Sequence, residues 1–470
     1  MIYDALMIGG GPGGYVCALR SAQLGLRVAV VEERDLGGIC LHWGCIPTKA
    51  LYAATRLVHQ ASTAAEMGIA FAAPNIDLPQ LATWKEGITA RLADSIAQLM
   101  KAAGVDVVPA RGRLHGRGAV ALSTGEPLEA RNIVLATGSR PIEIPGFPFS
   151  HPRVWSSDDA LRLREIPRRL VVIGGGVVGL ELATIYRRLG SDVTILELLP
   201  DVLATLGLDR RTLAVVKRGL TSAGIRVLNG TSASSLGEKD GIAEIALSDG
   251  SSLEADRILV AVGRRPNSTD LGLEKVGIEP DRRGAIPVSD RGETSAPGVY
   301  AIGDLVPGPM LAHKASADGL VAAHAMAGES RPATPVEFIP QVVFTDPEVA
   351  SIGFSETAAR AAGRDVLVGR FSFAGLGKAL GMREAEGFFQ VVADASSHCL
   401  LGVTIVGAEA SDLLAEGALA VRNGLTLEQV EETVHAHPTL PEGFHEAVEN
   451  ALGRGIHTAG RRPPAGSAGA

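Results

Sequence analysis

"DALMIGGGPGGYVCALRSAQLGLRVAVVE" (residues 4–32) has the pattern of a buried strand, a glycine-rich turn, a helix and a second buried strand. The turn has the spacing Gly9-x-Gly11-x-x-Gly14, and the second strand ends at Glu32. In such a unit the first glycine permits the turn, and the second lets the backbone approach a pyrophosphate. The third lets the helix pack on the strand, and the acid accepts from a ribose hydroxyl. The stretch therefore predicts a βαβ unit that binds a dinucleotide, rather than a mere glycine-rich turn.

The same pattern returns in "RLVVIGGGVVGLELATIYRRLGSDVTILE" (residues 169–197), whose glycines are Gly174, Gly176 and Gly179. A chain with two such units is expected to bind two different dinucleotides. The second strand ends at Glu197, and an acid there repels a 2′-phosphate and accepts from a free 2′-hydroxyl. The pair Arg210–Arg211 follows too far along the chain to replace it, so we expect NAD rather than NADP in the second unit.

The rest of the chain indicates further domains. A Pro-rich linker covers 140–152, and 298–319 is expected to be a strand, a turn carrying Asp304 and a helix. From Pro335 on, strand-like runs alternate with expected helices at 411–423, 426–433 and 441–452. The pattern predicts an α/β protein with two doubly wound dinucleotide-binding domains, followed by an α+β domain.

Composition excludes several classes of function. The net charge is −8 and no basic cluster stands out, which argues against nucleic acid as a partner. The sequence contains no run of 18 apolar residues, so no membrane span is predicted. The N-terminus lacks the cationic region and cleavage site of a signal peptide, so we expect a cytoplasmic chain that begins with its first strand.

Two of the four cysteines, Cys40 and Cys45, lie in "GGICLHWGCIPTKA" (residues 37–50). On a regular helix their Cα atoms would be ~8.6 Å apart, beyond the reach of about 7 Å that a disulfide allows. A bridge therefore requires irregular backbone before Cys45, which Gly44 can supply. Pro47 suits a first helical turn, so a thiolate at Cys45 would face helix N-terminal amides that lower its pKa.

A metal site or a pair of inert buried thiols would be a weaker interpretation of Cys40 and Cys45. Zinc thiolates usually come as CxxC with further ligands, and only His42 is close, so no metal site is predicted. Cys17 lies in the first fingerprint helix and is expected in the core, and Cys399 shows no partner.

A redox disulfide between two dinucleotide units implies electron flow. Hydride moves between a nicotinamide and a flavin, and a flavin passes two electrons to a disulfide. The thiol proton needs a base, and His437 with Glu442 five residues later is the candidate pair. Such a pair alone is more often a structural hydrogen bond. The redox cysteine pair in the same chain favours a catalytic role for it here. His435, His445, His313 and His457 are expected to be structural.

Together these residues resemble the flavin-dependent pyridine nucleotide–disulfide oxidoreductases, from residue 3 to about 457. The likeness rests on an ordered series of motifs. They are GGGPGGY (9–15), GGICLHWGCIPTKA (37–50), ATGSRP (136–141), GGGVVGLELA (174–183), VGRRPN (262–267), AIGD (301–304), MLAHKA (310–315), FTDPEVASIGF (344–354) and HAHPTL with the following Glu442 (435–442).

The resemblance implies the domain order and the cofactors, FAD and NAD. The implied domains are an FAD-binding domain (1–146), an NAD-binding domain (147–268), a central domain completing the FAD site (269–336) and a dimerisation domain (337–458). The remaining tail (459–470) is of low complexity, which predicts disorder.

The resemblance also implies residue roles at the two cofactors. The FAD site would contain Gly9, Gly11, Gly14, Glu32, Lys49 paired with Glu181, Gly112, Thr137, Gly138, Asp304 on the ribityl chain, and Ala312. The NAD site would contain Gly174, Gly176, Val177 as a gate over the flavin, Gly179, Glu197 on the ribose, and Gly263.

In this family pattern Cys45 contacts the flavin, Cys40 exchanges with substrate, and His437 acts on Cys40 of the other subunit of a homodimer. The chain departs from the pattern at Ile39, at His42, where an asparagine is usual, and at Pro441. His42 lies inside the redox loop and could shift the thiol pKa.

The implied activity is oxidation of protein-bound dihydrolipoyl groups by NAD⁺, in a 2-oxo acid dehydrogenase complex whose acyltransferase carries lipoyl domains. "WKEGI" (84–88) and "ALGRGIHT" (451–458) resemble the version that serves branched-chain complexes. The alternatives are another NAD(P)H-dependent disulfide reductase and a non-catalytic flavin-binding subunit. Glutathione- and trypanothione-type reductases use NADPH and have basic residues after the second strand of the second unit, where this chain has "ELLPD". Mercuric and large thioredoxin reductases need a further C-terminal cysteine or selenocysteine pair, and nothing after Cys399 provides one.

Overall fold

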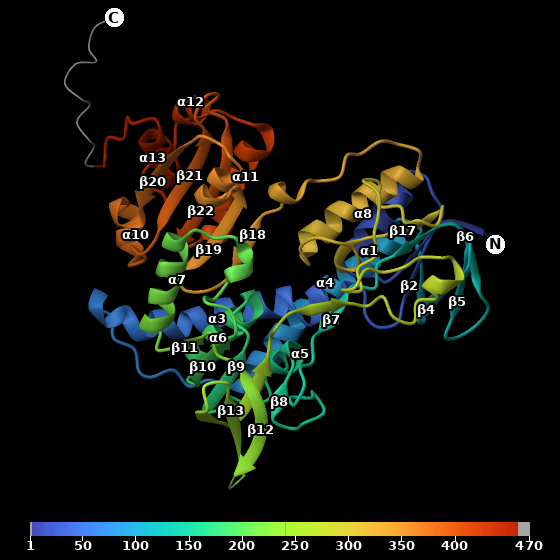
Figure 1. The fold of residues 1–470 in the computed structure, drawn as a ribbon, viewed down its shortest axis with the longest axis horizontal. Coiled ribbons are helices and arrows are strands. Elements are labelled where there is room, and N and C mark those ends of the chain that lie inside the picture. Colours follow the sequence, from blue (N-terminus) through green and yellow to red (C-terminus); the bar gives the residue numbers. More distant parts are fainter. Residues whose placement is uncertain (1, 240, 459–470) are drawn as a thin grey trace, which may run out of the picture. The chain divides into compact units, whose positions relative to one another are not determined.

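The computed structural model describes residues 2–239 and 241–458. These residues form two compact units, whose ribbons are drawn in Figure 1. The first unit contains the chain up to Gly174, the segment Arg188–Asp192 and the segment Ser232–Val336. The second contains Gly175–Arg187, Val193–Thr231 and the chain from Glu337 onward. The tail 459–470, predicted to be disordered, lies outside the described residues.

The first unit is built around a seven-stranded sheet, in the order β3-β2-β1-β6-β5-β4, with β17 also paired to β6. The pairings of β1 with β2 and β6, of β2 with β3 and of β17 with β6 are parallel. Its strands are β1 (Ile2–Ile8), β2 (Val28–Glu32), β3 (Asp106–Pro109), β4 (Gly112–Gly116), β5 (Ala119–Leu122), β6 (Leu128–Leu135) and β17 (Val299–Ala301).

Both faces of this sheet are buried, as a parallel sheet covered on two sides requires. Alternate residues of a strand point to opposite faces, so Ala5 and Met7 of β1 pack in the cluster that contains Cys17. Leu6 and Ile8 pack on the other side, in a cluster with Leu114. The doubly wound arrangement predicted for the first dinucleotide unit is confirmed.

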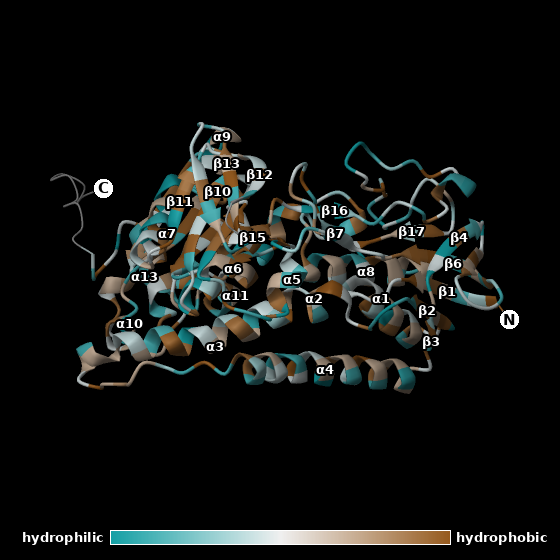
Figure 2. Ribbon diagram, turned by 90° about the horizontal axis from the view of Figure 1, so that it is seen from below, coloured by the Kyte–Doolittle hydropathy of each residue, from teal (hydrophilic) through white to brown (hydrophobic). Residues whose placement is uncertain are grey.

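The helices of the first unit include the two long ones that Figure 2 draws as α3 and α4. The helices are α1 (Pro12–Gln23), α2 (Gly38–His42), α3 (Cys45–Thr63), α4 (Leu78–Ala102), α5 (Ser157–Leu161) and α8 (Ala312–Met326), with short 3₁₀ turns η1 (Ala64–Met67), η3 (Leu273–Lys275) and η4 (Gly303–Leu305). Asp77 caps α4 by accepting from the Gln80 amide at 3.0 Å. Figure 2 shows hydrophobic and hydrophilic residues along α4, as expected for a helix with one covered face.

Strands of three smaller sheets also lie in the first unit. The strands β9 (Arg169–Ile173) and β8 (Val154–Trp155) both pair with β15 (Arg257–Val260) in parallel. The strands β12 (Ala233–Lys239), β13 (Ile242–Leu247) and β14 (Ser252–Ala255) form an antiparallel meander. The short strands β7 (Ser139–Pro141) and β16 (Arg264–Pro266) form an antiparallel pair.

The second unit contains a five-stranded antiparallel sheet in the order β18-β19-β22-β21-β20. It also contains β10 (Asp192–Glu197) paired in parallel with β11 (Arg226–Asn229). The other elements are α6 (Val177–Arg188), η2 (Ala204–Leu206), α7 (Arg210–Ser222), η5 (Val336–Phe338), β18 (Gln341–Val343), β19 (Glu348–Gly353), α9 (Glu356–Ala361), β20 (Val366–Ser372), η6 (Phe373–Gly375), α10 (Gly377–Met382), β21 (Phe388–Asp394), β22 (Leu400–Gly407), α11 (Ala410–Asn423), α12 (Leu427–Glu431) and α13 (Glu442–Ala451).

The core of the five-stranded sheet is aromatic and aliphatic. Phe373 stacks on Phe389 with ring centroids 4.9 Å apart, and Phe444 of α13 and Leu414 of α11 belong to the same buried cluster. The helices expected at 411–423, 426–433 and 441–452 correspond to α11, α12 and α13, which confirms the α+β character of this region. Within the described residues, no helix is long and apolar enough to cross a membrane.

Candidate functional site

The first glycine loop joins β1 to α1 and is closed by its own backbone. Gly9 has φ +109°, and a Cβ there would lie 2.4 Å from the Ala136 carbonyl oxygen, so the turn requires glycine. Gly14 faces the same constraint, because its Cβ would meet the Gly9 carbonyl. Glu32 accepts from the Gly10 amide through Oε2 at 2.7 Å and from the Arg34 amide through Oε1 at 2.8 Å. The acidic strand end is thus fixed by two backbone donors.

The second glycine loop repeats these contacts. Gly174 has φ +110°, and its Cβ would lie 2.5 Å from the Ala261 carbonyl oxygen. Glu197 is buried and accepts from the Gly175 amide at 2.6 Å and from the Leu199 amide at 2.7 Å. A carboxylate has about four lone-pair sites, so each glutamate keeps capacity for a ribose hydroxyl.

The loops fit a pyrophosphate where the fingerprint predicts it. A Cβ at Gly176 would meet nothing within 4 Å, and at Gly11 its nearest neighbour would be the Gly38 Cα at 3.9 Å. These glycines leave open space over the backbone, whereas Gly9 and Gly174 are required by the fold of their loops. Open space above the amides at the start of a helix is what an anionic pyrophosphate requires.

A disulfide joins Cys40 and Cys45, with Cα atoms 4.6 Å apart. Cys40 lies in α2 and Cys45 is the first residue of α3. Between the two helices the backbone leaves helical geometry at Trp43 and at Gly44, which has φ −149° and ψ −106°. The expectation that a bridge needs irregular backbone ending at Gly44 is confirmed. Cys45 then faces the amides of the first turn of a 19-residue helix.

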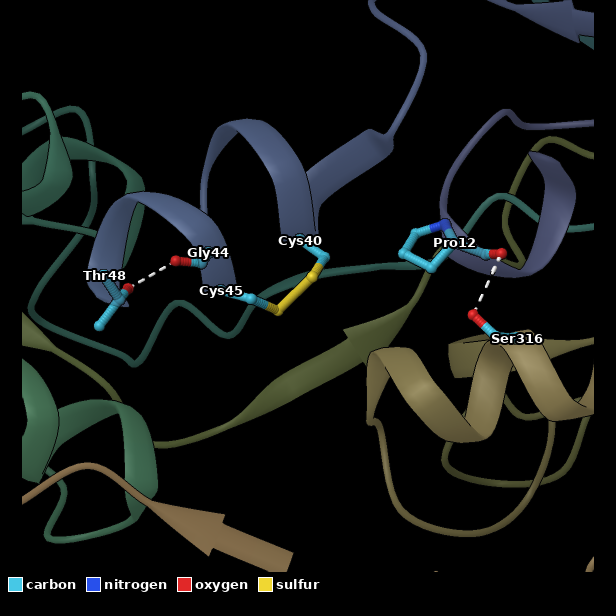
Figure 3. The surroundings of a disulfide bond; sticks show 6 residues. All are labelled: Pro12, Cys40, Gly44, Cys45, Thr48 and Ser316. Carbon is cyan, nitrogen blue, oxygen red and sulfur yellow. Dashed lines mark hydrogen bonds between the residues drawn. A yellow bond between two sulfur atoms is a disulfide. The ribbon is translucent and has the colours of Figure 1, made fainter. Parts of the chain in front are cut away.

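The segment that carries the disulfide packs against the first glycine loop. Figure 3 shows it with Pro12, the first residue of α1, and with Ser316, whose hydroxyl donates to the Pro12 carbonyl at 3.5 Å. The Gly37 amide donates to the Gly10 carbonyl at 2.9 Å. His42 contacts the Leu36 carbonyl through Nε2 at 2.9 Å, and because a carbonyl accepts, Nε2 carries the proton. The redox loop is therefore held against the loop expected to bind FAD.

The two remaining cysteines are free thiols. Cys17 is fully buried in α1, and burial raises its pKa to about 12, so it stays protonated. Cys399 is partly exposed. Both expectations for these residues are confirmed, and the pairing of Cys40 with Cys45 leaves no thiolate at rest in the redox loop.

This arrangement predicts the pattern of thiol labelling. Native oxidised protein treated with iodoacetamide should be alkylated at Cys399 alone, because Cys17 is buried and the other two are bridged. After mild dithiol reduction, Cys40 and Cys45 should also be alkylated, and Cys17 only after unfolding. Peptide mass spectrometry measures each site. Alkylation of Cys45 without a reductant would show that the pair is not bridged.

The predicted pair of a histidine base and its carboxylate partner, His437 and Glu442, is present at the start of α13. His437 Nδ1 lies 2.7 Å from Glu442 Oε1, and Glu442 is the first residue of the helix. Since a carboxylate only accepts, Nδ1 carries the proton and Nε2 is left to exchange one. The His437 side chain is 79 % exposed. The ring is thus oriented by its carboxylate and open to an approaching thiol.

Glu442 is itself held as a carboxylate. Burial acts to raise its pKa, but the Thr439 amide, which donates to Oε2, and the His437 ring outweigh burial, and the net pKa is lowered. The Thr439 hydroxyl donates to the Ala436 carbonyl at 2.6 Å, which fixes the turn between the two partners. Glu442 therefore remains charged at neutral pH and supports an imidazolium at His437.

The other histidines also have partners. His435 Nε2 lies 2.8 Å from Glu416 Oε1, and His445 Nε2 lies 3.2 Å from Glu449 Oε1. His457 contacts Glu446 at 2.5 Å, and its hydrogen bond with that carboxylate raises its pKa. In the described residues, no group of three or more His, Cys, Asp or Glu side chains is arranged to hold a metal ion.

The remaining expected FAD contacts lie in the first unit, apart from Glu181. Thr137 donates to the Asn267 carbonyl at 2.9 Å, and the Asn267 amide donates to the Gly138 carbonyl at 2.9 Å. Asp304 lies in η4 and accepts from Ser139 at 2.5 Å. Gly112 begins β4 and Ala312 begins α8.

Lys49 and Glu181 both have interaction partners, but their predicted pairing stays a prediction. Lys49 belongs to α3 in the first unit. Glu181 belongs to α6 in the second unit, where it is buried and accepts from the Phe344 amide at 3.1 Å. Val177 and Gly179 lie in the first turn of α6, and Gly263, with φ +127°, precedes β16.

Sequence reasoning missed the polar residues that hold this site. Ser139, Arg264 and Asn267 lie inside the motifs ATGSRP and VGRRPN. The motifs do not reveal that Arg264 contacts Ser139 or that Asn267 contacts Thr137. Lys314 and Asp318, four residues apart on α8, lie 2.7 Å apart and were equally missed. Their i, i+4 spacing was the one signal that could have found them.

Comparisons with known proteins agree with this geometry. Residues 3–319 match the family model described as pyridine nucleotide-disulphide oxidoreductase, and residues 339–448 match its dimerisation domain. The chain is similar to the dihydrolipoyl dehydrogenase of Thermus scotoductus, with 46 % identity covering 98 % of this chain and 99 % of that protein. It is also similar to the dihydrolipoyl dehydrogenase of Geobacillus stearothermophilus, with 43 % identity over 97 % of each.

The fold likewise matches solved structures. The crystal structure of LpdA from Mycobacterium tuberculosis aligns with a TM-score of 0.89 and 26 % identity, over 95 % of this chain and 98 % of that one. The flavoprotein disulfide reductase RclA of Escherichia coli, at 24 % identity and a TM-score of 0.86, shares the fold over 95 % of this chain and 99 % of its own. Two glycine loops, the bridged cysteines and both family models lead to one conclusion: the chain belongs to the pyridine nucleotide-disulphide oxidoreductase family.

Proposed function

We propose that this protein is a dihydrolipoyl dehydrogenase, which transfers two electrons from a protein-bound dihydrolipoyl group to NAD⁺. The observation that carries the proposal is the Cys40–Cys45 disulfide, held against the first of two glycine loops. Relatives that match the chain nearly end to end have this name. The balanced reaction converts dithiol and NAD⁺ to cyclic disulfide, NADH and a proton.

The cysteines carry out the thiol chemistry. One substrate thiolate attacks Sγ of Cys40, and Cys45 leaves as a thiolate that the first turn of α3 stabilises. The second substrate thiol then attacks the substrate sulfur that is bonded to Cys40 in the mixed disulfide. This closes and releases the lipoyl ring and leaves Cys40 as a thiolate. FAD, held by the first glycine loop, would supply the two-electron relay between the resulting dithiol and the nicotinamide.

His437 supplies the proton transfer. Its Nε2 takes the proton from the incoming thiol, and Glu442 on Nδ1 stabilises the imidazolium. Residues 339–448 match a dimerisation domain, so the enzyme is a homodimer. We propose that His437 of one subunit acts on Cys40 of the other; support comes from the family resemblance.

FAD and NAD are the cofactors, one for each glycine loop. Gly9 to Gly14 with Glu32 would hold the adenosine end of FAD, where Gly112 would contact the adenine through its backbone. Asp304 would hold the ribityl chain, Lys49 and Ala312 would lie near the flavin ring, and Thr137 and Gly138 would border the cofactor. Gly174 to Gly179, Glu197 and Gly263 would hold NAD, with Val177 as the gate. The domain edges at 146, 268, 336 and 458 belong to the same proposal.

Glu197 should make the second loop select NAD. The carboxylate, fixed by the Gly175 and Leu199 amides, repels a 2′-phosphate and accepts from the free hydroxyl. The ratio of kcat/KM for NAD⁺ over NADP⁺ should therefore be on the order of 10²-fold or more. In Glu197→Ala the ratio should fall sharply, mainly through loss of NAD⁺ affinity.

Asp201→Asn is the matched control, because Asp201 is a nearby acid whose partner is Lys217 at 2.7 Å. It should leave the preference unchanged. Equal kcat/KM for the two nucleotides in the wild-type enzyme would refute the role of Glu197.

The proposed protein partner is the lipoyl domain of an acyltransferase in a 2-oxo acid dehydrogenase complex. The reaction chemistry supports this, since the dithiol must be regenerated to the disulfide after each acyl transfer. The direct test compares free dihydrolipoamide with a reduced, lipoylated domain as the substrate for NAD⁺ reduction. No turnover with either substrate would sink the proposed function.

A further inference from the structure

A hydrogen-bonded chain links Arg264 to the carboxylate of Asp304 through Ser139. Arg264 Nε donates to the Ser139 hydroxyl at 2.7 Å, and that hydroxyl donates to Asp304 Oδ2 at 2.5 Å. Arg264 Nη2 also donates to the Ser139 carbonyl at 2.9 Å. Ser139 and Arg264 come from the paired strands β7 and β16.

The direction of this chain is fixed by chemistry. The guanidinium can only donate, a carboxylate can only accept, and a hydroxyl has one proton to give. Ser139 is fully buried, so its proton has to point at Asp304 while a lone pair accepts from Arg264. The contact uses Oδ2 of Asp304, and Oδ1 remains for a hydroxyl of a ligand.

Nearby carboxylates stabilise the positive charge of Arg264. Burial lowers the pKa of its guanidinium, and the charges of Asp304 and Asp158 act against that effect. Arg264 is partly buried, and removing part of a guanidinium charge from water is costly unless carboxylates balance it. The two carboxylates thus favour the charged form of Arg264 at this position.

The backbone of the Asp304 turn is held separately, from α8. Asp318 accepts from the Gly303 amide at 3.0 Å, and Lys314, paired with Asp318, donates to the Gly303 carbonyl at 3.3 Å. The turn therefore does not need Arg264 to keep its path. What Arg264 and Ser139 determine is the rotamer of the Asp304 carboxylate.

We propose that Arg264, acting through Ser139, is a positioning residue that pre-orients Asp304 for a hydroxyl of the ribityl chain of FAD. The inference rests on the proposed function, in which FAD is the cofactor of the first unit. Fixing a polar side chain before the ligand arrives removes an ordering cost from binding. The consequence is tighter FAD binding, independent of the later redox steps.

The test titrates apoenzyme with FAD and follows quenching of flavin fluorescence. Arg264→Met and Ser139→Ala should each raise the FAD dissociation constant by about 10- to 100-fold, the usual effect of losing a hydrogen bond to a charged group. Arg264→Lys keeps the charge but loses the planar set of guanidinium donors, so its FAD dissociation constant should lie between those of Arg264→Met and the wild type. Arg265, the next residue on β16, is exposed, so Arg265→Met is the matched control and should change affinity by no more than about twofold.

A double-mutant cycle separates positioning from general damage. In an Asp304→Ala background, Arg264→Met should have no further effect beyond about twofold, because the carboxylate that it orients is gone. An undiminished effect in that background, or wild-type affinity in Arg264→Met and Ser139→Ala, would overturn the inference. Two measurements establish that each apoenzyme is folded: its far-UV circular dichroism spectrum, and alkylation at Cys399 but at no other cysteine. Failure of the proposed function would appear separately, as absence of dihydrolipoamide turnover in the wild-type holoenzyme.

Discussion

A Cys45→Ser variant is expected to bind FAD like the wild type and to lose dihydrolipoamide turnover by on the order of 10⁴-fold or more, the scale expected when a covalently acting side chain is removed. Cys45 is one half of the Cys40–Cys45 bridge, and without it the electrons of the substrate dithiol cannot enter the enzyme. FAD should stay bound because the glycine loop, Glu32 and Asp304 are untouched. The measurements are NAD⁺ reduction with dihydrolipoamide and the flavin-to-protein absorbance ratio.

Cys399→Ser is the matched control, because Cys399 is a free and partly exposed thiol. It should retain both turnover and flavin. A Cys45→Ser enzyme with normal turnover would show that the bridge is only structural.

The second large effect is expected for His437→Gln. Loss of a positioned base typically costs about 10²- to 10⁴-fold, and it should appear only in the half-reaction with the dithiol. Reduction of the enzyme by NADH should stay near normal, because no substrate thiol needs deprotonation in that half. Stopped-flow measurement of each half-reaction separately gives the two rates. Glu442→Ala should have a smaller effect, since Glu442 orients the ring and supports its charge.

His457→Gln is the control for this variant. His457 is also exposed and also hydrogen-bonds a glutamate from α13, but no catalytic role is assigned to it. It should leave both half-reactions unchanged. If His437→Gln slowed both halves equally, or spared the dithiol half, the base would have been assigned to the wrong residue.

The same variant tests the proposed exchange between subunits. Mixed dimers of Cys45→Ser and His437→Gln chains contain one hybrid site with both residues intact if the base comes from the other subunit. They should recover up to about half of wild-type turnover per dimer, because one of two sites is complete. No recovery in demonstrated heterodimers would mean that each chain supplies its own base.

The sequence could predict those elements whose determinants are local. The glycine spacing, the flanking apolar runs and Glu32 all lie within 4–32, and the structure shows β1, α1 and β2 in that stretch. The strand, turn and helix expected at 298–319 are present as β17, η4 and α8. The need for irregular backbone before Cys45 followed from helix geometry alone, and Gly44 provides it.

Elements were missed where a nonlocal contact overrides the local signal. The strand β20 contains Gly369, which weakens a strand pattern. The structure shows why it is glycine, since a Cβ there would lie 1.9 Å from the Ala447 carbonyl of α13. The long helix α4 has a start signal in the sequence, Asp77 followed by Pro79, although no helix was predicted there.

The polar contacts that position the site are nonlocal as well. Ser139 and Arg264 lie 125 residues apart in the chain and meet because β7 pairs with β16. The fixing of Glu32 and Glu197 by backbone amides depends on the path of each loop, which the residue types alone do not reveal. Motifs therefore predicted the reactive residues and Glu442 as the partner of His437, whereas the contacts that fix Glu32, Glu197 and Asp304 required the fold.

The central claim is that electrons pass between the nicotinamide and the Cys40–Cys45 bridge within this one protein. Its most direct test is to add one equivalent of NADH to the oxidised holoenzyme without oxygen, quench with iodoacetamide, and map the alkylated cysteines. Wild type should be alkylated at Cys40 and Cys45 in addition to Cys399, and apoenzyme lacking FAD at Cys399 alone. Oxidation of NADH by the holoenzyme with Cys40 and Cys45 still bridged would contradict the account.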